Sequence, residues 1–89
     1  MRKLLICAVA AIALGSAALP ANAAVVCRLD PYGDNFLSLR SGPGGQFPEI
    51  DRLGPGTGVS IFTSAGPWLN VRTQDGQSGW VHGRYVCGR

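Results

Sequence analysis

The sequence predicts an all-β domain, a small barrel of about five to seven short strands, preceded by a cleavable signal helix. The chain has thirteen glycines and six prolines, and they interrupt it every few residues. After the predicted signal helix (residues 1–23, called the leader below), no window places apolar residues at the i, i+3, i+4, i+7 spacing of an amphipathic helix. Short runs of alternating apolar and polar residues occur instead, and close spacing of such runs without helices is typical of a barrel or sandwich.

The alternating runs define the expected strands and their inward faces. In a strand, every second side chain points to the same side of the sheet. Leu37 and Leu39 therefore share one face of the first run, and Leu69 and Val71 share one face of a later run. The expected strands are residues 36–40, 49–53, 57–63, 68–73 and 77–81, with a last strand at 85–87. The side chains expected to point inwards are Leu37, Leu39, Val59, Ile61, Leu69, Val71 and Val81.

Turn-forming residues separate these runs. A flexible loop is expected at residues 41–45, and tight reversals at 54–56 and 64–67. The pair Asp75-Gly76 predicts a type I′ hairpin turn, because both residue types tolerate a positive φ. We expect Gly79 to let the backbone pass beneath a large ring, and residues 82–85 to form one 3₁₀ turn.

Residues 1–23 have the three-part order of a secretory signal peptide. A positive start is followed by eleven uncharged residues at 4–14, and Ala21-Asn22-Ala23 offers the small-x-small pattern of a cleavage site. A membrane anchor is the alternative, but a bilayer core needs roughly 20 apolar residues, and Gly15 interrupts this run earlier. We therefore expect cleavage after Ala23 and a periplasmic or secreted product.

Lipid modification of Cys27 is a second alternative. A lipid-accepting cysteine follows a small residue, whereas Val26 precedes Cys27, and Cys7 lies inside the apolar run. Neither cysteine fits, so we expect no stable membrane anchor after cleavage.

Composition changes when the leader is removed. The precursor has eight Lys and Arg against five Asp and Glu, a net charge of +3. Loss of Arg2 and Lys3 leaves six arginines against the same five acids, a net charge of +1. The arginines are spaced singly and form no basic run, so nucleic acid is not an expected partner.

Two cysteines, Cys27 and Cys87, remain in the predicted 66-residue mature chain. A domain of this size forms only a marginal hydrophobic core, and export would bring the pair to an oxidising compartment. We expect a Cys27–Cys87 disulfide rather than free thiols or an intermolecular bridge. It would join the two ends of the barrel and contribute about 4 kcal/mol in the chain-entropy treatment.

Four motifs resemble those of bacterial SH3 (SH3b) domains. They are Leu-Ser-Leu-Arg-Ser-Gly-Pro at 37–43, Leu-Gly-Pro-Gly-Thr-Gly-Val at 53–59, Gly-Pro-Trp-Leu-Asn-Val-Arg at 66–72 and Asp-Gly-Gln-Ser-Gly-Trp-Val-His-Gly-Arg-Tyr-Val at 75–86. They occur in the family's order and span most of the mature chain. Pro67 is a departure, since the family usually has glycine directly before this tryptophan. The resemblance implies an SH3-like barrel at 36–89, after an N-terminal segment at 24–35 that carries Cys27.

The resemblance also implies a binding module with a shallow aromatic groove. The candidate ligand-binding residues are Trp68, Tyr85, Tyr32 and Phe47, whereas Trp80 is expected to cover the core. We expect recognition of peptidoglycan or a peptide in the cell envelope. Since no enzyme domain accompanies the barrel, the alternative is a protein–protein interaction or inhibitory module for another periplasmic or secreted protein. A third possibility is self-association through strand edges, although a monomer is expected.

Catalysis and metal binding find no support in the sequence. His82 is the only histidine and is expected at the surface in a turn, so no histidine-based metal cluster can form. No serine has an evident base partner, and a disulfide would remove both thiols as nucleophiles. We expect no enzyme activity, no metal and no cofactor.

Overall fold

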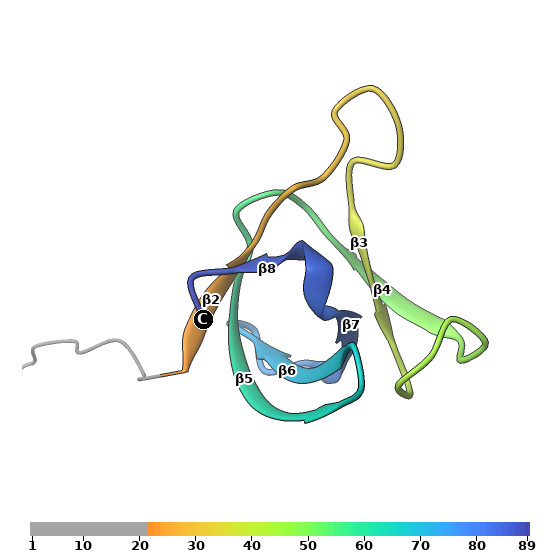
Figure 1. Cartoon of the computed structure of the whole chain (residues 1–89), viewed down its shortest axis with the longest axis vertical. Coiled ribbons are helices and arrows are strands. Elements are labelled where there is room, and N and C mark those ends of the chain that lie inside the picture. The colour runs from red at the N-terminus through yellow and green to blue at the C-terminus, as the bar shows by residue number, and fades with distance from the viewer. Residues whose placement is uncertain (1–21) are drawn as a thin grey trace, which may run out of the picture.

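The computed structural model describes residues 22–89 and confirms the all-β prediction. The predicted leader lies outside these residues except for Asn22 and Ala23. Seven strands and one 3₁₀ turn follow in order (Figure 1). They are β2 (Ala23–Val26), β3 (Leu37–Arg40), β4 (Glu49–Leu53), β5 (Gly58–Ala65), β6 (Trp68–Thr73), β7 (Ser78–His82), η1 (Gly83–Tyr85) and β8 (Val86–Cys87).

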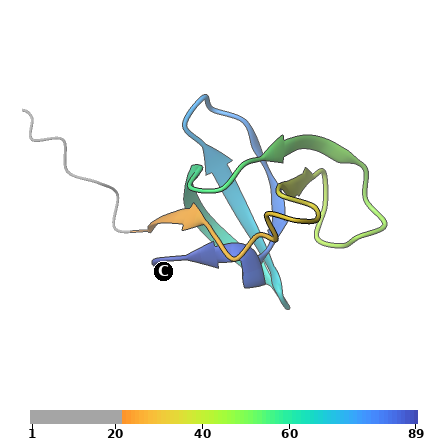
Figure 2. The ribbon, with the colours of Figure 1, turned by 90° about the horizontal axis from the view of Figure 1, so that it is seen from above.

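The strands form one antiparallel sheet in the order β4-β3-β7-β6-β5-β2-β8. Seen from above, the sheet curls on itself, and the segment between β2 and β3 crosses the open side (Figure 2). The first and last strands of the barrel lie side by side, because β2 pairs with both β5 and β8. The Cα atoms of Cys27 and Cys87 are 5.8 Å apart and the two residues form the predicted disulfide.

The core is small and lies inside the curled sheet. Leu39, Val71 and Val81 are fully buried, and they come from the three adjacent strands β3, β6 and β7. All the predicted inward side chains are buried except Ile61, which is only partly buried. Ile61 lies at a register shift in β5, where the strand departs from regular pairing with β6.

Strand β2 has no counterpart among the predicted strands. Ala24 and Val26 are buried while Val25 is 42% exposed, so the segment does alternate. The strand has only four residues and begins at Ala23, the last residue of the predicted leader, so its alternation is too short to separate from the leader by sequence pattern. The segment is a strand because β5 and β8 provide partners on both sides.

The β6–β7 turn differs from the predicted type I′ form. Gly76 has a φ of 90°, but Asp75 is not among the described residues with positive φ. The N–H of Gly76 donates to the Thr73 carbonyl at 3.0 Å, and that of Thr73 donates to the Gln77 carbonyl at 2.8 Å. The loop is therefore three residues ending in a left-handed glycine. Its shape is stabilised by the Thr73 hydroxyl, which donates to the Asp75 carboxylate and accepts from the Gln77 N–H.

Gly79 permits a close approach of a different kind from the one predicted. A Cβ at this position would lie 2.8 Å from the Arg40 carbonyl oxygen and 2.8 Å from Cγ of Leu39. The neighbour is therefore strand β3 and not an aromatic ring. The glycine beneath a ring is Gly42, where a Cβ would lie 2.5 Å from Cδ1 of Phe47.

Candidate functional site

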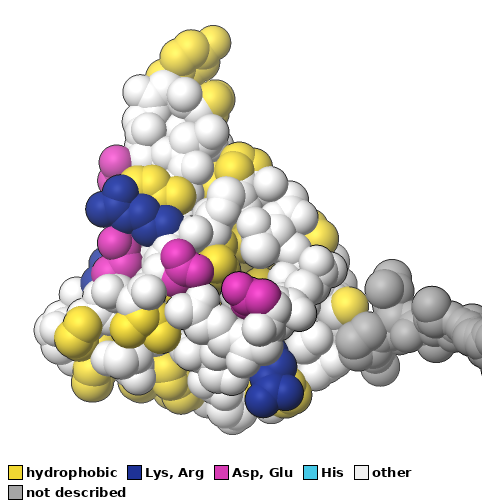
Figure 3. All heavy atoms as spheres, turned by 180° about the vertical axis from the view of Figure 1, so that it is seen from behind, with side chains coloured by type: hydrophobic (Ala, Val, Ile, Leu, Met, Phe, Trp, Pro, Cys, Tyr) yellow, Lys and Arg dark blue, Asp and Glu magenta, His cyan; other side chains and the backbone are white. Residues whose placement is uncertain are grey.

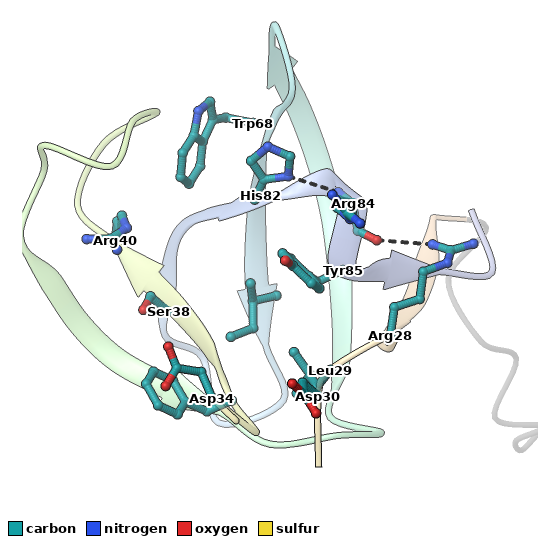
Figure 4. A pocket seen from close by; sticks show the side chains of 12 residues that line it. Arg28, Leu29, Asp30, Asp34, Ser38, Arg40, Trp68, His82, Arg84 and Tyr85 are labelled. Carbon is teal, nitrogen blue, oxygen red and sulfur yellow. Dashed lines mark hydrogen bonds between the residues drawn. The ribbon is translucent and has the colours of Figure 1, made fainter. Parts of the chain in front are cut away.

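A groove of about 550 Å³ lies between the N-terminal segment, for which we now use residues 24–34, and the strands β3, β6 and β7 with η1 (Figure 4). Trp68, His82 and Tyr85 form an aromatic row along one side. Arg28 and Asp30 border it from the N-terminal segment, and polar groups of β3 border it from the opposite side.

The aromatic row is built by strand pairing. Trp68 opens β6 and pairs directly with His82, the last residue of β7. Their ring centroids are 5.3 Å apart in an edge-on arrangement, and the His82 and Tyr85 centroids are 6.1 Å apart. All three side chains are half-buried. The row therefore presents apolar ring surface in the groove, and its Tyr85 side chain also packs against the core.

His82 is not the surface turn residue that the sequence predicted. It is half-buried at the end of β7, and its Nδ1 accepts a hydrogen bond from the Arg84 N–H at 3.2 Å. This bond caps η1, the turn that carries Tyr85. His82 was missed as a groove residue because its position depends on the pairing with Trp68, which no local pattern reveals.

Charged groups of both signs surround the aromatic row. Arg28 donates from Nη1 to the Arg84 carbonyl at 3.1 Å, and Arg40 donates from Nη1 to the Phe47 carbonyl at 3.0 Å. Asp30 accepts from the Tyr32 N–H at 2.9 Å. Arg28 and Asp30 lie on the N-terminal segment and Arg40 lies on β3, so charges of both signs border the groove. The groove therefore suits a ligand that has polar groups as well as apolar surface.

The β3 side of the groove is connected to a polar cluster on the barrel's edge. The Ser38 hydroxyl, which lines the groove, donates to the Glu49 carboxylate. Arg52 donates from Nε to the same carboxylate at 2.9 Å. These two hydrogen bonds lower the pKa of Glu49 below its ordinary value. The lowered pKa favours the ionised form of Glu49, whose carboxylate accepts the Ser38 hydrogen bond.

Of the four predicted ligand-binding residues, the structure brings two together. Trp68 and Tyr85 line the groove. Tyr32 is 97% exposed in the loop between β2 and β3, and Phe47 lies in the loop before β4 with its ring against Gly42. Neither of these two borders the groove. Trp80, expected over the core, is half-buried in β7 opposite Arg40 and Asn70.

Three further observations on the described residues concern surface charge, metal binding and membrane-spanning helices. Figure 3 shows acidic and basic side chains intermixed on the face opposite to that of Figure 1, without a field of one sign. No group of three or more His, Cys, Asp or Glu side chains within residues 22–89 is arranged to hold a metal ion. None of the helical structure in that part of the chain has the length and apolar character needed to cross a membrane.

Comparison with protein families decides the membership of the chain. A model described as bacterial SH3 domain matches residues 35–86, more than half of the sequence. The chain belongs to the bacterial SH3 domain family. No curated protein matches it. The family fold is that of a binding module, and the matched SH3 region includes the whole aromatic row but stops short of the N-terminal segment, which supplies Arg28 and Asp30 to the same groove.

Proposed function

We propose that this SH3 domain binds peptidoglycan, through its peptide stems, in the cell envelope and that the groove is the binding site. The observation that carries the proposal is the row of Trp68, His82 and Tyr85, half-buried side by side beside charged groups of both signs. Stem peptides offer small apolar side chains together with carboxylates, amines and amides. A groove with ring surface and polar edges complements that combination.

Two features support a location in the cell envelope. The Cys27–Cys87 disulfide is stable in oxidising compartments, and residues 1–23 have the order of a secretory signal. We propose export with cleavage after Ala23, and a periplasmic or secreted module that acts by binding rather than by catalysis.

The test is co-sedimentation with purified sacculi at low salt. We expect the wild-type domain in the pellet and expect Trp68→Ala to weaken retention by at least about tenfold, because a buried aromatic anchor often contributes 2 kcal/mol or more to binding. The matched control is Phe62→Ala, which removes another aromatic ring that is 59% exposed and does not line the groove.

The outcomes separate the alternatives. Equal losses for Trp68→Ala and Phe62→Ala would contradict the groove as the site. A wild-type domain that stays in the supernatant would contradict peptidoglycan binding and favour a partner protein, which periplasmic cross-linking would then identify.

A further inference from the structure

Arg28 is the only described residue other than glycine with a positive φ, 59°. This left-handed conformation is strained for an arginine, and such strain persists only where surrounding contacts enforce it. Glycine or asparagine would adopt it more easily. Arginine at this position therefore does not favour the stability of the fold. We therefore ask what its side chain contributes.

Several contacts hold Arg28 in this conformation. Cys27, its neighbour, is tied to Cys87 by the disulfide and donates its N–H to the Tyr85 carbonyl at 2.9 Å. Arg28 itself donates from Nη1 to the Arg84 carbonyl at 3.1 Å. Figure 4 shows the result, with the Arg28 side chain running beside η1 at the edge of the groove. The disulfide holds the backbone beside Arg28, and the hydrogen bond to η1 orients its exposed guanidinium.

Most of the hydrogen-bonding capacity of that guanidinium is unused. A guanidinium has five N–H donors, and apart from a long 3.8 Å contact to Sγ of Cys27, the Arg84 carbonyl is its one partner among the described residues. The sole ion pair between side chains of residues 22–89 joins Arg52 to Glu49, so no carboxylate neutralises Arg28. Arg84 adds a second guanidinium nearby, 5.9 Å from the centroid of the Tyr85 ring.

We infer that Arg28 is a specificity-determining residue of the groove and binds a carboxylate of the ligand. A fixed, unpaired guanidinium next to ring surface is suited to a planar anion, which it can bind through two parallel hydrogen bonds. The residue lies outside the region that the family match covers, so this preference belongs to the N-terminal segment rather than to the barrel. The inference rests on the proposed function, since it names the ligand group bound at that site.

The test compares untreated sacculi with sacculi whose carboxyl groups have been converted to amides. We expect amidation to lower retention of the wild-type domain about tenfold, the effect of losing one charge-assisted contact. Arg28→Gly should bind both preparations equally weakly, whereas Arg72→Gln should discriminate as the wild type does. Arg72 is the matched control because it is exposed on β6, near Phe62, and does not line the groove.

A stability measurement separates a binding role from a structural one. Arg28→Gly relieves the strained backbone, so its melting temperature should equal or exceed that of the wild type although its discrimination is lost. A lower melting temperature with retained discrimination would show that Arg28 serves the fold and would overturn the inference. Equal wild-type retention on both sacculus preparations would overturn this inference alone. No retention on untreated sacculi would overturn the proposed function and this inference with it.

A competition experiment identifies the carboxylate. A tripeptide with a free C-terminus should displace the wild-type domain from sacculi, and the same tripeptide with an amidated C-terminus should not, if the group recognised is a peptide terminus. If neither peptide competes while amidation of the sacculi still lowers retention, the recognised carboxylate belongs to another position in the wall polymer. Both results support recognition of a carboxylate, and loss of the same discrimination in Arg28→Gly assigns that recognition to Arg28.

Discussion

The two sides of the groove are held in place by different forces. The barrel side carries the aromatic row on β6, β7 and η1. The two strands also contain fully buried Val71 and Val81, and Tyr85 of this row packs against the core. The N-terminal segment contributes two buried side chains, Ala24 and Val26, and otherwise depends on short strand pairings and the disulfide. One side of the groove therefore belongs to the packed barrel and the other depends mainly on strand pairing and the disulfide, so the two can be perturbed separately.

Removal of the disulfide should have the largest effect on stability, and it should affect the N-terminal side of the groove more than the barrel side. We expect Cys27→Ser with Cys87→Ser to lower the free energy of unfolding by about 4 kcal/mol, because the bond closes a loop with a sequence separation of 60. Urea denaturation followed by tryptophan fluorescence measures the loss. Native-state hydrogen exchange should show the Val26 and Cys27 amides, bonded to the Thr57 and Tyr85 carbonyls, opening before those of β6 and β7. A uniform loss of protection would show that the two sides unfold as one unit.

A glycine substitution tests the barrel side alone. Gly79→Ala should destabilise the domain by about 1–3 kcal/mol, because the new methyl group would meet the backbone of β3, which cannot move without breaking the sheet. Gly45→Ala is the control, since a Cβ there has no atom within 4 Å. Thermal unfolding of both variants gives the comparison. Similar melting temperatures would contradict the close β3–β7 approach.

The smallest effect concerns the edge of the barrel beyond Ser38. Because folding lowers the pKa of Glu49, its contribution to stability is complete above the ordinary value of 4.5 and is lost as pH falls through the lower, folded value. Glu49→Gln should therefore destabilise the domain slightly at neutral pH and flatten the acid end of the stability profile. Ser38→Ala should raise the pKa of Glu49 towards 4.5, since the hydrogen bond from Ser38 is the largest cause of the lowered pKa.

Glu49 is the only glutamate in the sequence, so a glutamate-labelled sample gives one carboxyl resonance to titrate by NMR. A Glu49 pKa at or above 4.5 in the wild type would contradict the cluster.

The barrel strands could be predicted because their signal is local. Leu37 with Leu39, and Leu69 with Val71, alternate within single strands, and β3, β4 and β6 begin and end within one residue of the predicted runs. The β6–β7 turn was predicted with the wrong geometry because the Thr73 hydroxyl, outside the Asp75-Gly76 pair, determines its shape.

The groove was only half predictable. Trp68 and Tyr85 lie where the family motifs place them, but the paths of the long loops decide where Tyr32 and Phe47 lie. Arg28 and His82 could not be found from the sequence, because each acquires its position through a partner distant in the chain, Arg84 for the first and Trp68 for the second.

The disulfide between the two ends of the barrel has a mechanical consequence. Tension applied between the residues before Cys27 and those after Cys87 would pass through one covalent bond, since the bridge joins the two cysteines directly. Strand β2 precedes Cys27, so pulling would first peel it from β5 and β8. The strands between the two cysteines would then carry no load, and β3 to β7 should separate under force only after a reductant is added.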